Sequence, residues 1–146
     1  MTENGTDQAQ DRTGLRSRLS DLAEIFRWTE GLASRYAIPA NVQFAMDLCL
    51  EEVLSNIIRH GYAGEEDRSV IVGFTVPRAG YFVLVVDDEA PHFNPLDIPD
   101  LPMANPYEET HLGGQGIRLL RRFADALTYE STPNGNRLRI GFSDLQ

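Results

Sequence analysis

The sequence contains no lysine, because all thirteen of its basic residues are arginines. This absence excludes Schiff-base chemistry, a lysine general base and the phosphate-binding loop that depends on lysine. Any phosphate must therefore be held by arginine, by backbone amides or by a metal ion. The single cysteine, Cys49, excludes an internal disulfide and a zinc site built from several cysteines, and it is most simply a small core residue.

Long apolar runs and positive charge are also scarce. No apolar stretch approaches the ~20 residues that cross a bilayer, and the polar N-terminus does not resemble a signal peptide. We therefore expect a soluble, cytoplasmic protein that does not bind membranes. Acidic residues outnumber basic ones by 22 to 13, which gives a net charge of −9 and a pI near 4.7. Such a surface repels phosphate backbones, so direct binding to nucleic acid is not expected.

The length of 146 residues and the apolar fraction of 42% predict one globular domain with a sizeable core. Residues 1–14 are polar and are expected to form a disordered tail. Residues 15–146 then form the single domain. The alternation of apolar and polar residues from Leu15 to Leu19 predicts that it begins with a short edge strand.

Hydrophobic periodicity predicts the remaining elements. Apolar residues at three- and four-residue steps predict helices over about 21–36, 40–62 and 113–126. Apolar runs separated by turn residues predict two hairpins, formed by 69–76 with 81–87 and by 127–131 with 137–142. The proline-rich stretch between the hairpins shows no periodicity, which is typical of a functional lid, at about 89–112.

Strands joined by tight turns pair antiparallel, so this order of elements predicts a fold of the α+β class. The expected architecture is a two-layer α/β sandwich. A mostly antiparallel mixed sheet is covered on one face by about three helices.

Two polar side chains interrupt the second predicted helix at a spacing of four residues. Glu52 and Asn56 therefore share one face of an otherwise apolar helix, where an uncompensated carboxylate would be costly. A carboxylate one turn from an amide oxygen suits a general base beside a magnesium ligand, because magnesium prefers oxygen donors. Spacing alone leaves open the alternative of a solvated pair at the edge of the helix.

Three further features could bind a ligand. Asp88 follows the apolar strand 81–87, where a carboxylate can accept a hydrogen bond from an exocyclic amine or simply close a turn. The glycine cluster at 113–116 opens a helix, which permits either close approach of an anion to the backbone or a flexible hinge. Arg118 lies in the first turn of that helix, where it could reach a phosphate or belong to a solvated face.

Together, the order and spacing of these features resemble the anti-sigma-factor serine kinases. These kinases belong to the ATP-binding (GHKL, or Bergerat-fold) superfamily of gyrase, histidine kinases and mismatch-repair ATPases. The resemblance is carried by an asparagine box LEEVLSNIIRHGY (50–62), an aspartate box DEAPHFNPL (88–96), a second glycine box GGQGIRLLRRFAD (113–125) and a closing hairpin GNRL (135–138). It extends over about 15–142, nearly the whole chain.

The resemblance implies a role for each matching residue. Glu52 would be the base that activates the attacking hydroxyl, Asn56 would bind Mg²⁺, and Asp88 would hold the adenine amine of ATP. The other residues implied at the nucleotide are Ala90, His92, Gly113, Gly114, Gly116 and Arg118, with the glycines lining the lid around the phosphates.

The resemblance also implies an activity and partners. The expected activity is that of an ATP-dependent protein serine/threonine kinase, which phosphorylates a Ser or Thr of a small antagonist protein of the STAS type. In its other state such a kinase, usually a homodimer, holds a sigma factor inactive, so the two partners form a switch that regulates transcription.

Two positions depart from the family pattern. The family usually has glycine where this chain has Ala90, and glycine or proline where it has His92. A methyl group at a position of close backbone approach can crowd the nucleotide or resist a positive φ. These departures favour the alternative of a nucleotide-gated or nucleotide-free module that sequesters its partner without phosphorylating it.

Overall fold

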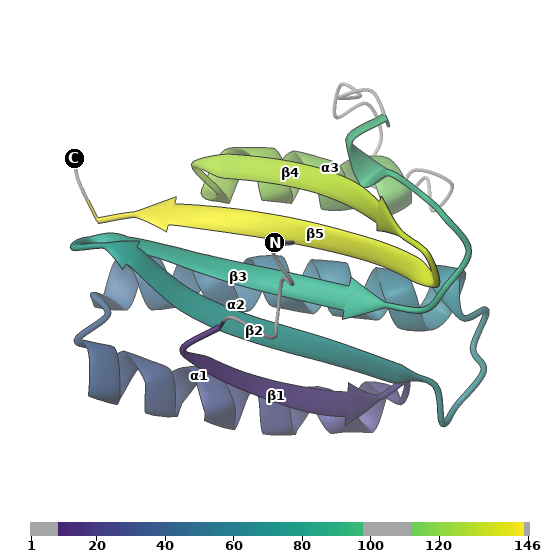
Figure 1. Ribbon diagram of the computed structural model, residues 1–146, viewed down its shortest axis with the longest axis horizontal. Helices are drawn as coiled ribbons and strands as arrows, with labels where there is room; N and C mark the ends of the chain where they lie inside the picture. The colour runs from purple at the N-terminus through teal and green to yellow at the C-terminus, as the bar shows by residue number, and fades with distance from the viewer. Residues whose placement is uncertain (1–8, 98–111, 145–146) are drawn as a thin grey trace.

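The computed structural model describes residues 9–97 and 112–144, and of residues 112–116 it describes the backbone only. A sheet and a layer of helices make up this part of the chain (Figure 1). The strands are β1 (Asp11–Arg16), β2 (Ser69–Arg78), β3 (Tyr81–Asp88), β4 (Ala126–Thr132) and β5 (Gly135–Ser143). The helices are α1 (Leu22–Tyr36), α2 (Ala40–Asn56) and α3 (Leu112–Phe123), with short 3-10 turns at Leu19–Asp21 and Pro95–Asp97 and a π-helical turn, η3 (Ile57–Gly61).

The five strands form one sheet in the order β1-β2-β3-β5-β4, and every neighbouring pair is antiparallel. The last strand, β5, is therefore inserted between β3 and β4. The predicted α+β sandwich is confirmed, with one refinement. All strand pairs in the described residues are antiparallel, rather than most of them. The crossover through α3 brings β4 back parallel to β3, but β5 lies between these two strands and is antiparallel to both.

The apolar face of the sheet lies against the three helices, which Figure 1 shows behind the strands. Phe74, Leu84 and Ile140 occupy one row across β2, β3 and β5, and all three are fully buried. Helix α2 contributes the buried Leu50 and Leu54 to the same core. Alternation along each strand thus directs one set of side chains into a single core.

The opposite face of the sheet carries ion pairs as well as apolar side chains such as Ile71 and Val85. Arg137 binds Asp87 through two hydrogen bonds, of 2.9 Å from Nε and 3.1 Å from Nη2. Arg139 Nη1 lies 2.9 Å from Glu130 Oε1. Since successive side chains of a strand point to opposite faces, Asp88 points toward the helical layer and Asp87 away from it.

The expected boundary between tail and domain is wrong, because β1 begins at Asp11 and residues 11–14 belong to the sheet. The carboxylate of Asp11 accepts a hydrogen bond of 3.1 Å from Trp28 Nε1 and lies 2.8 Å from Arg35 Nη2, so α1 holds the start of the strand. The predicted edge strand at Leu15 also ends early, at Arg16, because a 3-10 turn begins at Leu19.

The second predicted helix is divided at Asn56. Helix α2 ends there, and η3 continues with the wider turn, in which the Tyr62 amide donates to the carbonyl oxygen of Ile57 over 2.7 Å. Such π-turns are frequent at functional sites, since they change the direction of the side chains that follow. The chain then leaves the helix through Gly64, whose φ of +79° requires glycine-like freedom.

Of the predicted lid, 89–97 is described as irregular chain ending in the Pro95–Asp97 turn, and 98–111 lies outside the described residues. None of the helices in the described part of the chain combines the length and the apolar character needed to cross a membrane.

Candidate functional site

A cavity of about 630 Å³ lies between α2, η3, α3 and the ends of β3 and β5. This volume falls within the range typical of small-molecule sites. Four of the predicted site residues line it, namely Asn56, Asp88, Ala90 and His92. The rest of the lining is mainly apolar and includes Val53, Ile57, Val86, Phe93, Ile117, Leu120 and Leu138. The cavity therefore suits a flat apolar ring with a few polar atoms at its edge.

The polar end of the cavity is built around Asp88, the last residue of β3. Its Oδ1 accepts hydrogen bonds of 2.8 Å from the Ala90 amide and 2.8 Å from Asn136 Nδ2. Burial raises the pKa of Asp88, and the neighbouring charges of Asp87 and Glu89 add to this, whereas the two hydrogen bonds lower it. A half-buried carboxylate with one oxygen occupied is well suited to accept a hydrogen bond from an amine of a ligand.

Asn136 belongs to the GNRL motif, in which the sequence predicts no separate role for it. In the structure it is the centre of the polar contacts around Asp88. Its side chain is only 6% exposed and lies in β5 directly opposite Asp88 in the strand ladder. The predicted hairpin strand 137–142 begins two residues too late, because β5 begins at Gly135 and the connecting turn is formed by residues 133–134. The polar type of Asn136 at a buried strand position is the signal that could have identified it.

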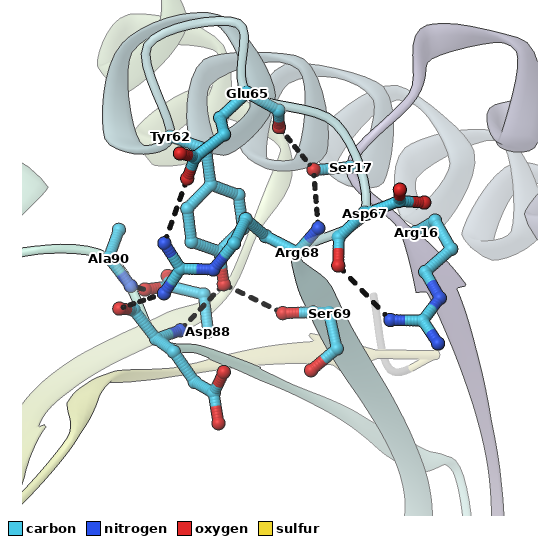
Figure 2. A network of polar contacts seen from close by, with 10 residues as sticks. Arg16, Ser17, Tyr62, Glu65, Asp67, Arg68, Ser69, Asp88 and Ala90 are labelled. Carbon is cyan, nitrogen blue, oxygen red and sulfur yellow. Dashed lines mark hydrogen bonds and ion pairs between the residues drawn. The ribbon is translucent and has the colours of Figure 1, made fainter.

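A second network holds the residue that follows Asp88 (Figure 2). The hydroxyl of Tyr62 accepts a hydrogen bond of 2.7 Å from the Glu89 amide and donates one of 2.7 Å to the carbonyl oxygen of Ser69. The guanidinium of Arg68 lies over the Tyr62 ring, 4.9 Å from its centre. Tyr62, for which the local sequence predicts no role, thus ties the end of β3 to the start of β2 and to the end of η3.

The first departure from the family pattern is accommodated by a neighbouring glycine. Ala90 is 5% exposed and its φ is not positive, so the methyl group causes no backbone strain. The methyl carbon lies 3.1 Å from the position that a Cβ on Gly61 would occupy. The absence of a side chain at Gly61 therefore provides the space that the Ala90 methyl group fills.

The second departure, His92, is directed toward the closing hairpin. Its Nε2 donates a hydrogen bond of 2.8 Å to the carbonyl oxygen of Thr132, the last residue of β4. His92 therefore links the aspartate loop to the end of the β4–β5 hairpin while one side of it lines the cavity.

The predicted base and metal ligand lie one helical turn apart at the end of α2. Asn56 lines the cavity, whereas Glu52 is half-buried outside the set of residues that line it. Burial raises the pKa of Glu52, with a contribution from Glu51, and Arg59 lowers it. A carboxylate with a raised pKa is a stronger base, which suits the predicted role.

The donor atoms at this end of the cavity fit a magnesium ion of the kind that accompanies nucleotides. Asn56 presents an amide to the cavity, and its side chain makes no hydrogen bond to any other described residue. Among the described residues no cluster of three or more His, Cys, Asp or Glu side chains could hold a metal by itself. One protein oxygen together with water and phosphate oxygens is a common coordination for Mg²⁺.

The glycine cluster lies in the first turns of α3, since this helix begins at Leu112. Gly113, Gly114 and Gly116 are described by their backbone only, so their predicted contact with phosphates stays a prediction. Arg118 lies in the second turn rather than the first, is half-buried, and is not among the described lining residues.

An antiparallel sheet covered by three helices, with a cavity between α2, α3 and the end of β3, defines the class of histidine-kinase-type ATP-binding domains. The chain belongs to the family of the histidine kinase-like ATPase domain, which matches residues 15–142. The resemblance noted in the sequence is thus confirmed at the level of the superfamily.

The chain is similar to the serine/threonine-protein kinase BtrW of Bordetella bronchiseptica, with 27% identity over 113 residues that cover 77% of this chain and 79% of that protein. It is also similar to the anti-sigma F factor of Priestia megaterium, with 26% identity over 83 residues that cover 57% and 56% of the two chains. Among solved structures, the mycobacterial sensor histidine kinase MprB has the same fold, with 14% identity, a TM-score of 0.52 and coverage of 91% of this chain and 97% of that one.

Proposed function

We propose that the protein is an ATP-dependent serine/threonine protein kinase of the anti-sigma-factor type. The observation that carries this proposal is the cavity at Asp88, where a carboxylate held by two hydrogen bonds faces an apolar slot in a histidine kinase-like ATPase fold. The serine/threonine kinase BtrW and the anti-sigma F factor, to which the chain is similar, support the class of activity.

In this proposal each end of the cavity has its own task. Asp88 accepts a hydrogen bond from the adenine amine, and the apolar lining covers the faces of the ring. Asn56 would hold Mg²⁺, which neutralises charge on the phosphate oxygens when it is bound. Gly113, Gly114, Gly116 and Arg118 are proposed to approach the phosphates, while Ala90 and His92 shape the edge of the adenine slot.

Glu52 is the proposed general base. It would take the proton of a serine or threonine hydroxyl as that oxygen bonds to the γ-phosphorus and the bond to the β-phosphate oxygen breaks. ADP leaves and the acceptor carries the phosphoryl group. Positioning and electrostatic stabilisation supply most of the acceleration in such transfers, so removal of the base slows the reaction without preventing nucleotide binding.

The proposed acceptor is a small antagonist protein of the STAS type, and the proposed second partner is a sigma factor or a similar regulator that a homodimer holds inactive. The name of the anti-sigma F factor supports a sigma factor as partner. The acidic surface, with a net charge of −9, suits a protein whose partners are proteins with basic faces.

The first test is calorimetric titration of Mg-ATP into the wild type, Asp88→Asn and the control Glu89→Gln. Glu89 is an exposed carboxylate next to Asp88, so its replacement removes the same charge from outside the cavity. We expect Asp88→Asn to weaken binding at least ~10-fold and the control to change it little. Absence of binding by the wild type at millimolar ATP would contradict the proposal and favour the sequestering module.

The second test follows transfer of the labelled γ-phosphoryl group to a purified STAS-domain protein from the same organism. Glu52→Gln should retain Mg-ATP binding and lose transfer by ~100-fold or more. Glu51→Gln, an exposed neighbour on the same helix, is the matched control and should transfer normally. Normal transfer by Glu52→Gln would remove Glu52 from the role of base.

A further inference from the structure

The side chain of Asn136 is the buried polar group on which the aspartate loop is organised. Its Nδ2 lies 2.8 Å from Asp88 Oδ1, 3.2 Å from the carbonyl oxygen of Ala90 and 3.1 Å from that of Pro91. Its Oδ1 accepts a hydrogen bond of 2.9 Å from the Phe93 amide and another from the Tyr129 hydroxyl. The loop 88–93 therefore wraps around one amide group.

These partners define the orientation of the amide. Three acceptors surround Nδ2 and two donors surround Oδ1, so the reversed amide would place an oxygen against three oxygens. Both ends of the group are fully occupied by the protein. Asn136 consequently has no free donor or acceptor with which to bind a ligand directly.

Among the partners of Asn136, Asp88 is the one that brings a carboxylate to the cavity, so an effect specific to the amine of a ligand passes through Asp88. The strand ladder places the two residues opposite each other, and the hydrogen bond from Nδ2 joins the one from the Ala90 amide on Oδ1. With Oδ1 occupied, Oδ2 is the oxygen left to face the cavity. A carboxylate oxygen held in this way accepts a hydrogen bond from a 6-amino group and repels a 6-oxo group.

We propose that Asn136 is a positioning residue that orients Asp88 and thereby sets the preference of the cavity for a purine with a 6-amino group. This inference rests on the proposed function, since it assumes that a purine nucleotide occupies the cavity.

The test compares ATP with inosine triphosphate, which carries an oxygen in place of the 6-amino group. Both are titrated with Mg²⁺ into the wild type, Asn136→Ala, Asp88→Asn and the double variant. Asn134→Ala serves as the matched control, because Asn134 is an exposed asparagine two residues away in the turn. Circular dichroism and thermal unfolding establish that each variant is folded.

We expect Asn136→Ala to weaken ATP binding by about 10-fold or more and to change inosine triphosphate binding by less than about threefold. In the Asp88→Asn background the same substitution should weaken ATP binding by less than about threefold, since its effect passes through Asp88. Asn134→Ala should match the wild type with both nucleotides. If Asn136→Ala does not fold, Asn136→Ser, which retains a small donor, takes its place in the same comparison.

A purely structural role would give a different result. In that case Asn136→Ala would weaken the binding of ATP and of inosine triphosphate equally. It would also weaken ATP binding by the same factor in the Asp88→Asn background as in the wild type. Either outcome overturns the inference. If Asn136→Ala binds ATP as tightly as the wild type while Asp88→Asn binds it more weakly, the inference is overturned and the proposed function stays intact. A wild type that binds neither nucleotide overturns both.

Discussion

Gly135 lies directly against the backbone of Asp88. A Cβ atom built on Gly135 would come within 1.9 Å of the Asp88 carbonyl oxygen and 2.7 Å of the Glu89 Cα. No flexible side chain can move away to relieve this contact, because both neighbours are main-chain atoms. The closing hairpin therefore approaches the aspartate loop as closely as it does only because residue 135 has no side chain.

We predict that Gly135→Ala displaces the Asp88–Glu89 peptide, destabilises the fold by about 1–3 kcal/mol and weakens Mg-ATP binding about 10-fold or more. Urea unfolding and calorimetry provide the two measurements. Gly141→Ala is the control on the same strand, since its added Cβ would meet the mobile end of the Tyr81 side chain, with the hydroxyl oxygen 2.0 Å away. That variant should bind ATP normally, and an equal loss of binding in both would contradict the prediction.

The Tyr62 hydroxyl is expected to matter for both stability and binding. Tyr62→Phe leaves the Glu89 amide and the Ser69 carbonyl group without their partner, which should cost about 1–3 kcal/mol in the free energy of unfolding. Mg-ATP binding should weaken severalfold, because the Glu89 amide directly follows Asp88. Tyr36→Phe, which removes a hydroxyl with no hydrogen bond to a described residue, should change neither quantity. Unchanged binding in Tyr62→Phe would show that the loop is held without this hydroxyl.

The elements of the fold were predicted correctly where the local apolar periodicity determines the structure. Helix α1 and the two hairpins follow the apolar pattern closely, since burial on one face is what orders them. The start of β1 was missed because residues 11–14 are polar and their partner lies far along the chain. Asp11 pairs with Phe74, and no local window contains both.

Contacts between segments that are distant in the sequence also limited the prediction of the candidate site. Asn56, Asp88, Ala90 and His92 could be placed near one another because they lie in recognisable segments, and the structure brings them to one cavity. The supporting residues could not, because their role consists of contacts between distant segments. Tyr62 reaches Glu89 across 27 residues and Asn136 reaches Asp88 across 48, so no local window contains both partners of either contact. The polar type of Asn136 within a strand is a local signal, but it does not name Asp88 as the partner.

The thiol of Cys49 should be unreactive in the folded protein. The side chain is fully buried in the core, and burial, with a contribution from Glu52, raises its pKa to about 12. Because the thiolate is the reactive species, alkylation at pH ~8 should proceed only as fast as the protein opens. Mass spectrometry after timed exposure to iodoacetamide measures the rate, and protein in guanidinium chloride is the control that should react fully. Rapid alkylation under native conditions would show that the core around α2 opens readily.

The ionised carboxylate of Asp88 should reduce the stability of the folded protein at neutral pH, although the same carboxylate is proposed to bind the ligand. Burial raises its pKa above the ordinary 3.8, so the folded state binds this proton more tightly than the unfolded state does. The contribution of Asp88 to the free energy of unfolding therefore falls as the pH rises from its pKa in the unfolded state through its pKa in the folded state. Above this pH window the buried carboxylate is ionised, and this form destabilises the folded protein. Asp88→Asn keeps a carbonyl oxygen for the Ala90 amide and for Asn136 but carries no charge.

We therefore predict that Asp88→Asn unfolds at an equal or higher urea concentration than the wild type at pH ~7, and that its advantage shrinks as the pH is lowered toward ~4. Trp28 fluorescence follows the transition, and Glu89→Gln, which alters an exposed carboxylate, should show no such trend. Loss of ATP binding together with unchanged or increased stability would identify Asp88 as a group retained for its ligand rather than for the fold. A variant that is less stable than the wild type at neutral pH would instead assign the carboxylate a structural role.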